Sequence, residues 1–344
     1  MDKIKIPESP DSPMDKIRKN ISRTEDFCLR EGLAFKKPLL ILGTFERVGS
    51  NWLLDTLNQH IHTHNEPFKQ QLGETSPFST MSPVLKDVSD PSSANIDPFA
   101  QYWLETFTST KYGTTNHAVK ETNLFYAIEN FLRLFPDAQI LLLKRESLGI
   151  FSSFIDQDLF TRWNYAERYV NLKRVAETGK WSKFSFVFED QDGHELSDVE
   201  MLTRLLFLNC LLLDSHLQGK NFKQLAYESS VKARSDFLRF LSNDVFAGIR
   251  FSDTENVDTK ENAGAQGTFS TQRSKIKLES YLDTDDAKLI SFELHRLLLQ
   301  ATQMFPKRTI ELCEDFLGYD KDQYEVDLHP LEGTRRDSRL SGKI

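Results

Sequence analysis

The sequence predicts an α/β fold in which a mostly parallel sheet lies between two layers of helices. Two apolar runs, at 38–45 and 138–145, have the continuous hydrophobic pattern of strands that are buried on both faces. Each run is followed at once by a segment whose apolar residues recur at helical spacing. Strand, turn and helix in this order form the repeating unit of a parallel sheet.

The elements follow in order along the chain. After the strand at 38–45 we expect a helix at 50–61, and Ser197 with Glu200 has the spacing of a capping box at the start of a long helix. Segments 69–98 and 161–192 show no clear pattern, and 252–270 reads as a long polar loop. The remaining predictions are strands at 117–121 and 222–228 and helices at 123–135, 147–157, 197–217, 231–241 and 284–304.

The length of 344 residues and the 39% hydrophobic content allow a substantial core in one main domain. We expect this domain at 37–320, after an N-terminal extension at 1–36 with one short helix and before a polar C-terminal tail at 321–344.

The net charge of −8 argues against a broad basic surface for nucleic acid or for anionic lipid. No apolar run reaches the length of a membrane span, and the polar N-terminus has no secretory signal. Three scattered cysteines argue against a disulfide framework or a cysteine zinc site. We therefore expect a cytoplasmic protein without a nucleic-acid partner, whose oligomeric state is open, a homodimer included.

The segment between the first strand and its helix has the composition of an anion-binding turn. Backbone N–H groups at a helix N-terminus bind anions, and Gly49 would allow a close approach while Arg47 adds charge. The alternative is that Gly43 and Gly49 only serve the turn. A P-loop kinase would carry Lys directly after the second glycine, where this chain has Ser50.

A second cationic position ends the strand at 138–145. Arg145 is its last residue, and Ser153 lies in the helix that follows, where it could also bond back to its own helix. Ligands of open α/β sheets bind at the carboxyl edge of the strands, so Arg145 should lie near the first turn. Two anion sites at one edge indicate a ligand with two separated phosphate-like groups.

These two segments resemble the phosphate motifs of sulfotransferases that use 3′-phosphoadenosine 5′-phosphosulfate (PAPS). Arg47-Val48-Gly49-Ser50-Asn51-Trp52 resembles the 5′-phosphosulfate loop [RK]-S-G-[ST]-[TN]-[WL], with Val48 where a small polar residue is usual. Arg145 followed by Ser153 resembles the 3′-phosphate motif R-D-P-x-x-x-x-x-S, with Glu146 and Ser147 at Asp-Pro. Tyr227-Glu228 is similar to Y-E-x-[LM], and HNEPF at 64–68 to a G-E-P-F-like stretch.

The resemblance spans about 38–300 and implies a P-loop NTPase-like sulfotransferase fold for the domain at 37–320. It implies transfer of a sulfuryl group from PAPS to a hydroxyl, or an amine, of a small-molecule or carbohydrate acceptor. Adenosine 3′,5′-bisphosphate would be the product, and no metal would be needed. The implied nucleotide-binding residues are Arg47, Val48, Gly49, Ser50, Asn51, Trp52, Arg145, Ser153, Tyr227, Gln272, Arg273 and Lys275.

The acceptor proton needs a base within hydrogen-bond reach, and Glu66 in the HNEPF stretch is our first candidate. His64 is a competitor, as are His62 and His117, and Lys120 at the end of a predicted strand would assist as a cation. Each also has an ordinary interpretation as a structural or solvated side chain.

Two further questions stay open at this point. The aromatic-rich stretch 160–169 either lines an acceptor cleft or packs in the core. The departures at Glu46, Val48, Glu146 and Ser147 leave room for a sulfotransferase-like protein that binds a nucleotide or a partner without turnover.

Overall fold

The computed structural model describes residues 13–33, 36, 38–65, 116–120, 138–178, 181–189, 195–251 and 285–318. Within these ranges it contains a five-stranded sheet with the order β2-β3-β1-β4-β5, and every pairing is parallel. The predicted parallel sheet is therefore confirmed. The strands are β1 Leu39–Gly43, β2 His62–Asn65, β3 His117–Lys120, β4 Ile140–Lys144 and β5 Phe222–Ala226.

β1 lies at the centre of the sheet because its side chains are apolar on both faces. All five of its residues are buried, as are the four of β3. Gly43 of β1 is in register with Leu143 of β4, so the two strands end at the same edge. The turns that follow β1 and β4 are thereby brought together, as the ligand-binding edge of a parallel sheet requires.

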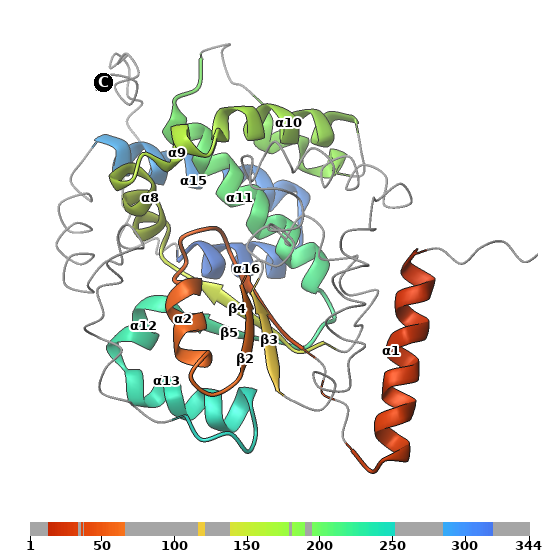
Figure 1. Ribbon diagram of the computed structural model, residues 1–344. Coiled ribbons are helices and arrows are strands. Elements are labelled where there is room, and N and C mark those ends of the chain that lie inside the picture. Colours follow the sequence, from red (N-terminus) through yellow and green to blue (C-terminus); the bar gives the residue numbers. More distant parts are fainter. Residues whose placement is uncertain are drawn as a thin grey trace, which may run out of the picture.

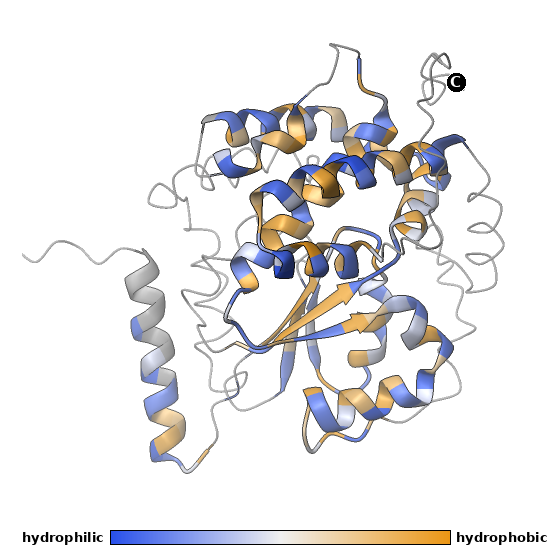
Figure 2. Ribbon diagram, turned by 180° about the vertical axis from the view of Figure 1, so that it is seen from behind, coloured by the Kyte–Doolittle hydropathy of each residue, from blue (hydrophilic) through white to orange (hydrophobic). Residues whose placement is uncertain are grey.

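Helices cover the sheet on both sides. In Figure 1, α2, α12 and α13 lie on one side, and α11, α15 and α16 lie on the other; α1 stands clear of the sheet. β1 and β4 are mostly hydrophobic, whereas β2 is hydrophilic and the flanking helices mix both kinds of residue (Figure 2). The α-helices are α1 Pro13–Arg30, α2 Ser50–Leu57, α8 Ser147–Asp156, α9 Leu159–Arg162, α10 Tyr165–Thr178, α11 Asp198–Leu217, α12 Tyr227–Lys232, α13 Arg234–Phe240, α15 Asp285–Met304 and α16 Lys307–Leu317.

Most of the predicted elements within the described residues are present. The capping box is confirmed, since Ser197 Oγ accepts from the Glu200 N–H at 3.3 Å and the Glu200 carboxylate accepts from the Ser197 N–H at 2.8 Å. The helix predicted at 231–241 is instead broken at Ala233, whose φ of −116° and ψ of 60° separate α12 from α13. The helix predicted at 123–135 and the loop at 252–270 lie outside the described residues.

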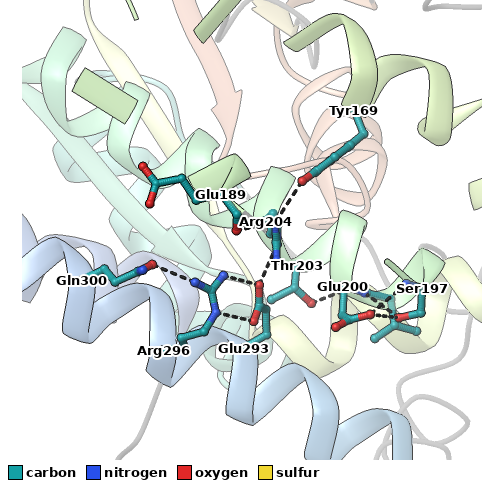
Figure 3. Close-up of polar contacts among 10 residues, drawn as sticks. Tyr169, Glu189, Ser197, Glu200, Thr203, Arg204, Glu293, Arg296 and Gln300 are labelled. Atoms are coloured by element: carbon teal, nitrogen blue, oxygen red, sulfur yellow. Dashed lines mark hydrogen bonds and ion pairs between the residues drawn. The ribbon is translucent and has the colours of Figure 1, made fainter. Parts of the chain in front are cut away.

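α10, α11 and α15 are joined by a buried polar cluster (Figure 3). Arg204 of α11 donates from Nε to Glu293 of α15 at 2.7 Å and from Nη1 to the Tyr169 hydroxyl of α10 at 3.1 Å. Arg296 binds the same carboxylate from Nε at 2.7 Å and from Nη2 at 2.5 Å. Arg204 and Glu293 are both almost fully buried, so the ion pair fixes how these helices pack.

α16 is fastened to the junction of β4 and α8. Lys144, the last residue of β4, pairs with Asp315, and the Ser147 hydroxyl donates to the Leu317 carbonyl at 2.5 Å. Gly318, at φ 60°, lies so close to Glu146 that a Cβ would be 3.1 Å from its Cα. The end of α16 therefore supports the turn that carries Arg145.

Candidate functional site

The turn after β1 is strained in a specific place. Arg47 has a φ of 68° and Gly49 has a φ of 85°, both in the left-handed region. For a residue with a side chain this conformation costs roughly 1–2 kcal/mol. Such a conformation persists only where the surroundings determine it, and this one turns the Arg47 side chain toward α8.

The two predicted anion motifs meet at this turn. Arg47 Nε donates to Ser153 Oγ of α8 at 2.9 Å, and Arg145 Nη1 donates to the Arg47 carbonyl at 2.8 Å. Arg47, Arg145 and Ser153 therefore form one cluster at the carboxyl edge of β1 and β4. The adjacency that the parallel topology predicts is present.

The electrostatics of the cluster favour an anion. Burial lowers the pKa of the Arg47 guanidinium, and the neighbouring charge of Arg145 lowers it further. Glu228 lies 3.5 Å from Arg145 Nε, and burial raises the pKa of that carboxyl. Two guanidinium groups thus share a half-buried space beside the Glu228 carboxylate, whose raised pKa makes it easier to protonate than an exposed glutamate.

Two glycines shape this space. Gly149, in the first turn of α8, lets the Arg145 side chain lie against the helix, since a Cβ there would be 2.9 Å from Arg145 Nε. The position of a Cβ on Gly49 is taken by the ring of Tyr227, whose Cδ2 would be 2.1 Å away. The space that Gly49 leaves therefore holds the side chain of Tyr227, the first residue of α12.

Aromatic side chains continue from Tyr227. Its ring lies under the Arg145 guanidinium, 5.0 Å from centroid to Cζ, and makes an edge contact with Trp52 at 5.8 Å. Trp52 also packs against Phe237 at 4.8 Å and is only partly buried. The structure thus brings Trp52 and Tyr227, two of the implied nucleotide-binding residues, next to the arginine cluster.

A buried lysine lies next along the same edge of the sheet. Lys120 is 3% exposed, and its Nζ donates to Asn51 Oδ1 at 2.7 Å and to Asn65 Oδ1 at 3.1 Å. Lys120 and Asn65 are opposite each other in the register of β3 and β2. Since each amide oxygen accepts from Lys120, each amide NH₂ is directed away from it and can serve another acceptor.

The histidines form a separate group. The ring of His64 lies 4.5 Å from that of His62 and 5.9 Å from that of His117. Burial and the other imidazoles lower the pKa of His64 to about 3. Side chains alternate along a strand, so His64 faces the side of β2 opposite to Asn65. The structure does not bring His64 to Lys120.

The other predicted site residues have varied surroundings. Val48 is fully buried and its side chain packs against Gly43, while Ser50 begins α2 and is 7% exposed. In the stretch 160–169, Phe160, Tyr165 and Tyr169 are buried, which agrees with core packing. Four predicted residues lie outside the described part of the chain: Glu66, Gln272, Arg273 and Lys275.

Sequence reasoning did not single out Asn65 or the partners of Glu46. Asn65 sits beside the HNEPF stretch, but a lone Asn carries no pattern. Glu46 is 5% exposed and is bound by Tyr165 and Arg168, which follow it by more than a hundred residues. Only the tertiary packing of α10 against the turn after β1 brings Tyr165 and Arg168 to Glu46.

Within the described residues, no group of three or more histidines, cysteines or carboxylates is arranged to hold a metal ion. No helix of that part of the chain is long and apolar enough to cross a membrane.

No protein-family model matches the chain, and no curated protein sequence matches it significantly. Among solved structures, the chain is similar to the sulfotransferase STF9 from Mycobacterium avium, with a TM-score of 0.36 and 13% identity over 85% of this chain and 84% of that one. It is also similar to the sulfotransferase STF1 from Mycobacterium tuberculosis H37Rv, with a TM-score of 0.35 and 9% identity over 82% of this chain and 83% of that one.

Proposed function

We propose that the protein binds PAPS at the carboxyl edge of β1 and β4 and transfers its sulfuryl group to a hydroxyl or an amine. A small molecule or a carbohydrate is the proposed acceptor. The observation that carries the proposal is the meeting of Arg47, Arg145 and Ser153, joined by hydrogen bonds of 2.9 and 2.8 Å. A nucleotide with phosphates at both the 3′ and 5′ positions offers the two anionic groups that such a cluster suits.

The residues present fit a phosphate. Arg145 Nε is buried and makes no hydrogen bond within the described residues, although Glu228 lies 3.5 Å away. A buried donor of this kind calls for an acceptor, and a phosphate oxygen would satisfy it. The Ser153 hydroxyl accepts from Arg47 and can still donate its own hydrogen to an anion.

PAPS would supply a sulfuryl group that is already attached to a good leaving group, a phosphate. In this proposal Arg47 and the backbone of Gly49, Ser50 and Asn51 hold the 5′ end, and Arg145 with Ser153 holds the 3′-phosphate. Trp52 and Tyr227 border the base. Preorganised donors of this type stabilise charge as it develops on the leaving oxygen.

Lys120 and the two amides would act beside the transferred group. Its ammonium is held between Asn51 and Asn65, and Asn51 also belongs to the 5′ loop. Glu66 follows Asn65 directly in the chain, so the proposed general base stands one residue from the lysine contact. The base would take the acceptor proton, and Lys120 would stabilise negative charge.

Calorimetry with three nucleotides tests the proposal. Adenosine 3′,5′-bisphosphate should bind saturably, 5′-AMP should bind at least about ten-fold more weakly because it lacks the 3′-phosphate, and ATP with Mg²⁺ should not compete. Saturable binding of ATP-Mg²⁺ in place of the bisphosphate would reject the proposal in favour of a kinase. Radiolabelled PAPS and an acceptor panel then test transfer, and binding without transfer to any acceptor would identify a sulfotransferase-like binding protein.

A further inference from the structure

A buried ion pair lies beneath the Arg47 turn. Glu46 is 5% exposed, and its carboxylate accepts from the Tyr165 hydroxyl at 2.6 Å and from Arg168 Nη1 at 3.0 Å. Tyr165 and Arg168 are three residues apart on α10, so they share one helix face. The Arg168 side chain is fully buried and also lies over the rings of Phe45 and Tyr165, at 5.6 and 4.8 Å.

The pair is placed where a charge is costly. Phe45, Phe154 and Tyr165 pack around it with ring centroids 5.1 to 6.0 Å apart, so the carboxylate has left water for an aromatic environment. An apolar pair would often stabilise such a place equally well. A buried ion pair differs from an apolar contact because its hydrogen bonds are directional, and they therefore fix the position and orientation of the two groups.

The fixed orientation of the Glu46 side chain matters because Glu46 immediately precedes Arg47 in the chain. The left-handed conformation of Arg47, at φ 68°, needs its neighbours to hold it. On the carboxyl side the turn is held by Gly49 against Tyr227, and on the amino side the Glu46 side chain is bound to α10. The Arg47 peptide lies between these two anchors.

We infer that Glu46, Tyr165 and Arg168 form a positioning unit, which holds Arg47 in the conformation that binds the 5′ end of the nucleotide. The inference rests on the proposed function. Arg168 and Tyr165 act through Glu46 and Arg47 and touch neither nucleotide nor acceptor. α10 is thereby part of the nucleotide site, although no anion motif of the sequence lies on it.

The test compares Arg168→Met with Arg204→Met, which breaks an ion pair of similar burial between α11 and α15. Calorimetry gives the dissociation constant of adenosine 3′,5′-bisphosphate, and thermal melting shows that each variant is folded. Arg168→Met should weaken binding about ten-fold, while Arg204→Met should leave it within about two-fold even if it melts at a lower temperature. Arg168→Lys should restore part of the affinity, since it keeps the charge.

Two more variants separate positioning from general loosening. Arg168→Met added to Arg47→Ala should cost no further affinity, within about two-fold, because Arg168 acts through Arg47. Tyr165→Phe removes only the hydroxyl and should weaken binding about three-fold, so it carries the test if Arg168→Met does not fold.

The outcomes are distinct. A folded Arg168→Met or Tyr165→Phe with wild-type affinity would overturn the inference and leave the proposed function intact. Equal weakening by Arg204→Met would also overturn it, because the effect would then belong to stability. If the wild-type protein does not bind the bisphosphate at all, the proposed function fails, and the positioning role fails with it.

Discussion

A Cβ atom on Gly49 would lie 2.1 Å from Cδ2 of Tyr227, far inside van der Waals contact. The turn after β1 and the start of α12 are therefore packed so closely that position 49 has room only for the hydrogen of a glycine. Gly49 also has a φ of 85°, so two separate physical demands fall on one residue.

Gly49→Ala should therefore destabilise the protein more than a positive φ alone explains. Gly248 is the matched control, since its φ is 93° and a Cβ there would meet no atom of the described residues within 4 Å. We expect Gly248→Ala to cost roughly 1–2 kcal/mol and Gly49→Ala to cost about 2 kcal/mol more, measured by urea unfolding. Equal losses would show that Tyr227 moves aside freely.

Arg145→Ala should weaken binding of adenosine 3′,5′-bisphosphate by about a hundred-fold, because it removes a charged donor and also the support of the Arg47 carbonyl. Arg239→Ala is the control, since that arginine is exposed on α13 and pairs only at the surface. Calorimetry gives both dissociation constants. Wild-type affinity in Arg145→Ala would remove this residue from the site.

Glu66→Gln should abolish sulfuryl transfer and leave the affinity for the bisphosphate within about two-fold, because a general base acts on the acceptor and not on the nucleotide. Glu311→Gln, an exposed carboxylate on α16, should keep wild-type turnover. The measurement pairs a transfer assay with calorimetry on the same preparations. Normal turnover in Glu66→Gln would assign the base to another residue.

The cluster in Figure 3 predicts an asymmetric response to mutation. Glu293→Gln should destabilise by about 3–5 kcal/mol, because it leaves the buried Arg204 without its carboxylate. Arg204→Met should cost less, since Glu293 keeps Arg296 at 2.5 Å. Arg239→Met, which breaks an exposed pair, should cost under about 1 kcal/mol. Denaturant unfolding ranks the three, and the reverse order for the buried variants would contradict the assignment.

The burial of His117 should lower the free energy of unfolding in mild acid. Burial lowers its pKa from 6.5 to about 4, so only the unfolded chain takes up this proton as the pH falls below 6.5. The free energy of unfolding is therefore unaffected by this group well above pH 6.5. It should fall by about 2 kcal/mol between about pH 7.5 and about pH 5. His117→Gln should lack this part of the slope. Between about pH 7.5 and about pH 9 the two proteins should show the same slope, because His117 is neutral there in both states.

The central strands, and the edge of the sheet at which they end, could be predicted from the sequence. The apolar runs of β1 and β4 mark strands buried on both faces, and parallel topology then places Arg145 beside the Arg47 turn. β2 was missed because His62–Asn65 has neither apolar alternation nor β-branched enrichment; pairing with β3 makes it a strand. α10 was missed because its apolar residues follow a weak helical pattern and tertiary packing selects it. α16 was missed although its buried residues, Ile310, Cys313, Phe316 and Leu317, recur at helical spacing, so the sequence does contain the signal that predicts it.

The candidate site likewise contains residues that the sequence predicts and residues that it does not. The proximity of Arg47 and Arg145 could be predicted because each follows the end of a buried strand, and Ser153 was expected beside them from the resemblance to the 3′-phosphate motif. The contacts of Asn65 with Lys120 and of Arg168 with Glu46 could not be predicted, because they join residues far apart in the sequence and leave no local pattern. Burial of a charge such as Glu46 is likewise invisible in the sequence until its partners are known.

The attachment of α16 to the junction of β4 and α8 has a consequence for synthesis of the chain. Arg145 emerges from the ribosome early, yet the turn that carries it is tied to Asp315 and Leu317, about 170 residues later. A nascent chain that has made every proposed nucleotide-binding residue of the described region would still lack the contacts with α16. Nucleotide affinity should therefore arise as a late and abrupt event during translation, once α16 has left the exit tunnel, and ribosome-bound chains stalled before and after α16 would show the step.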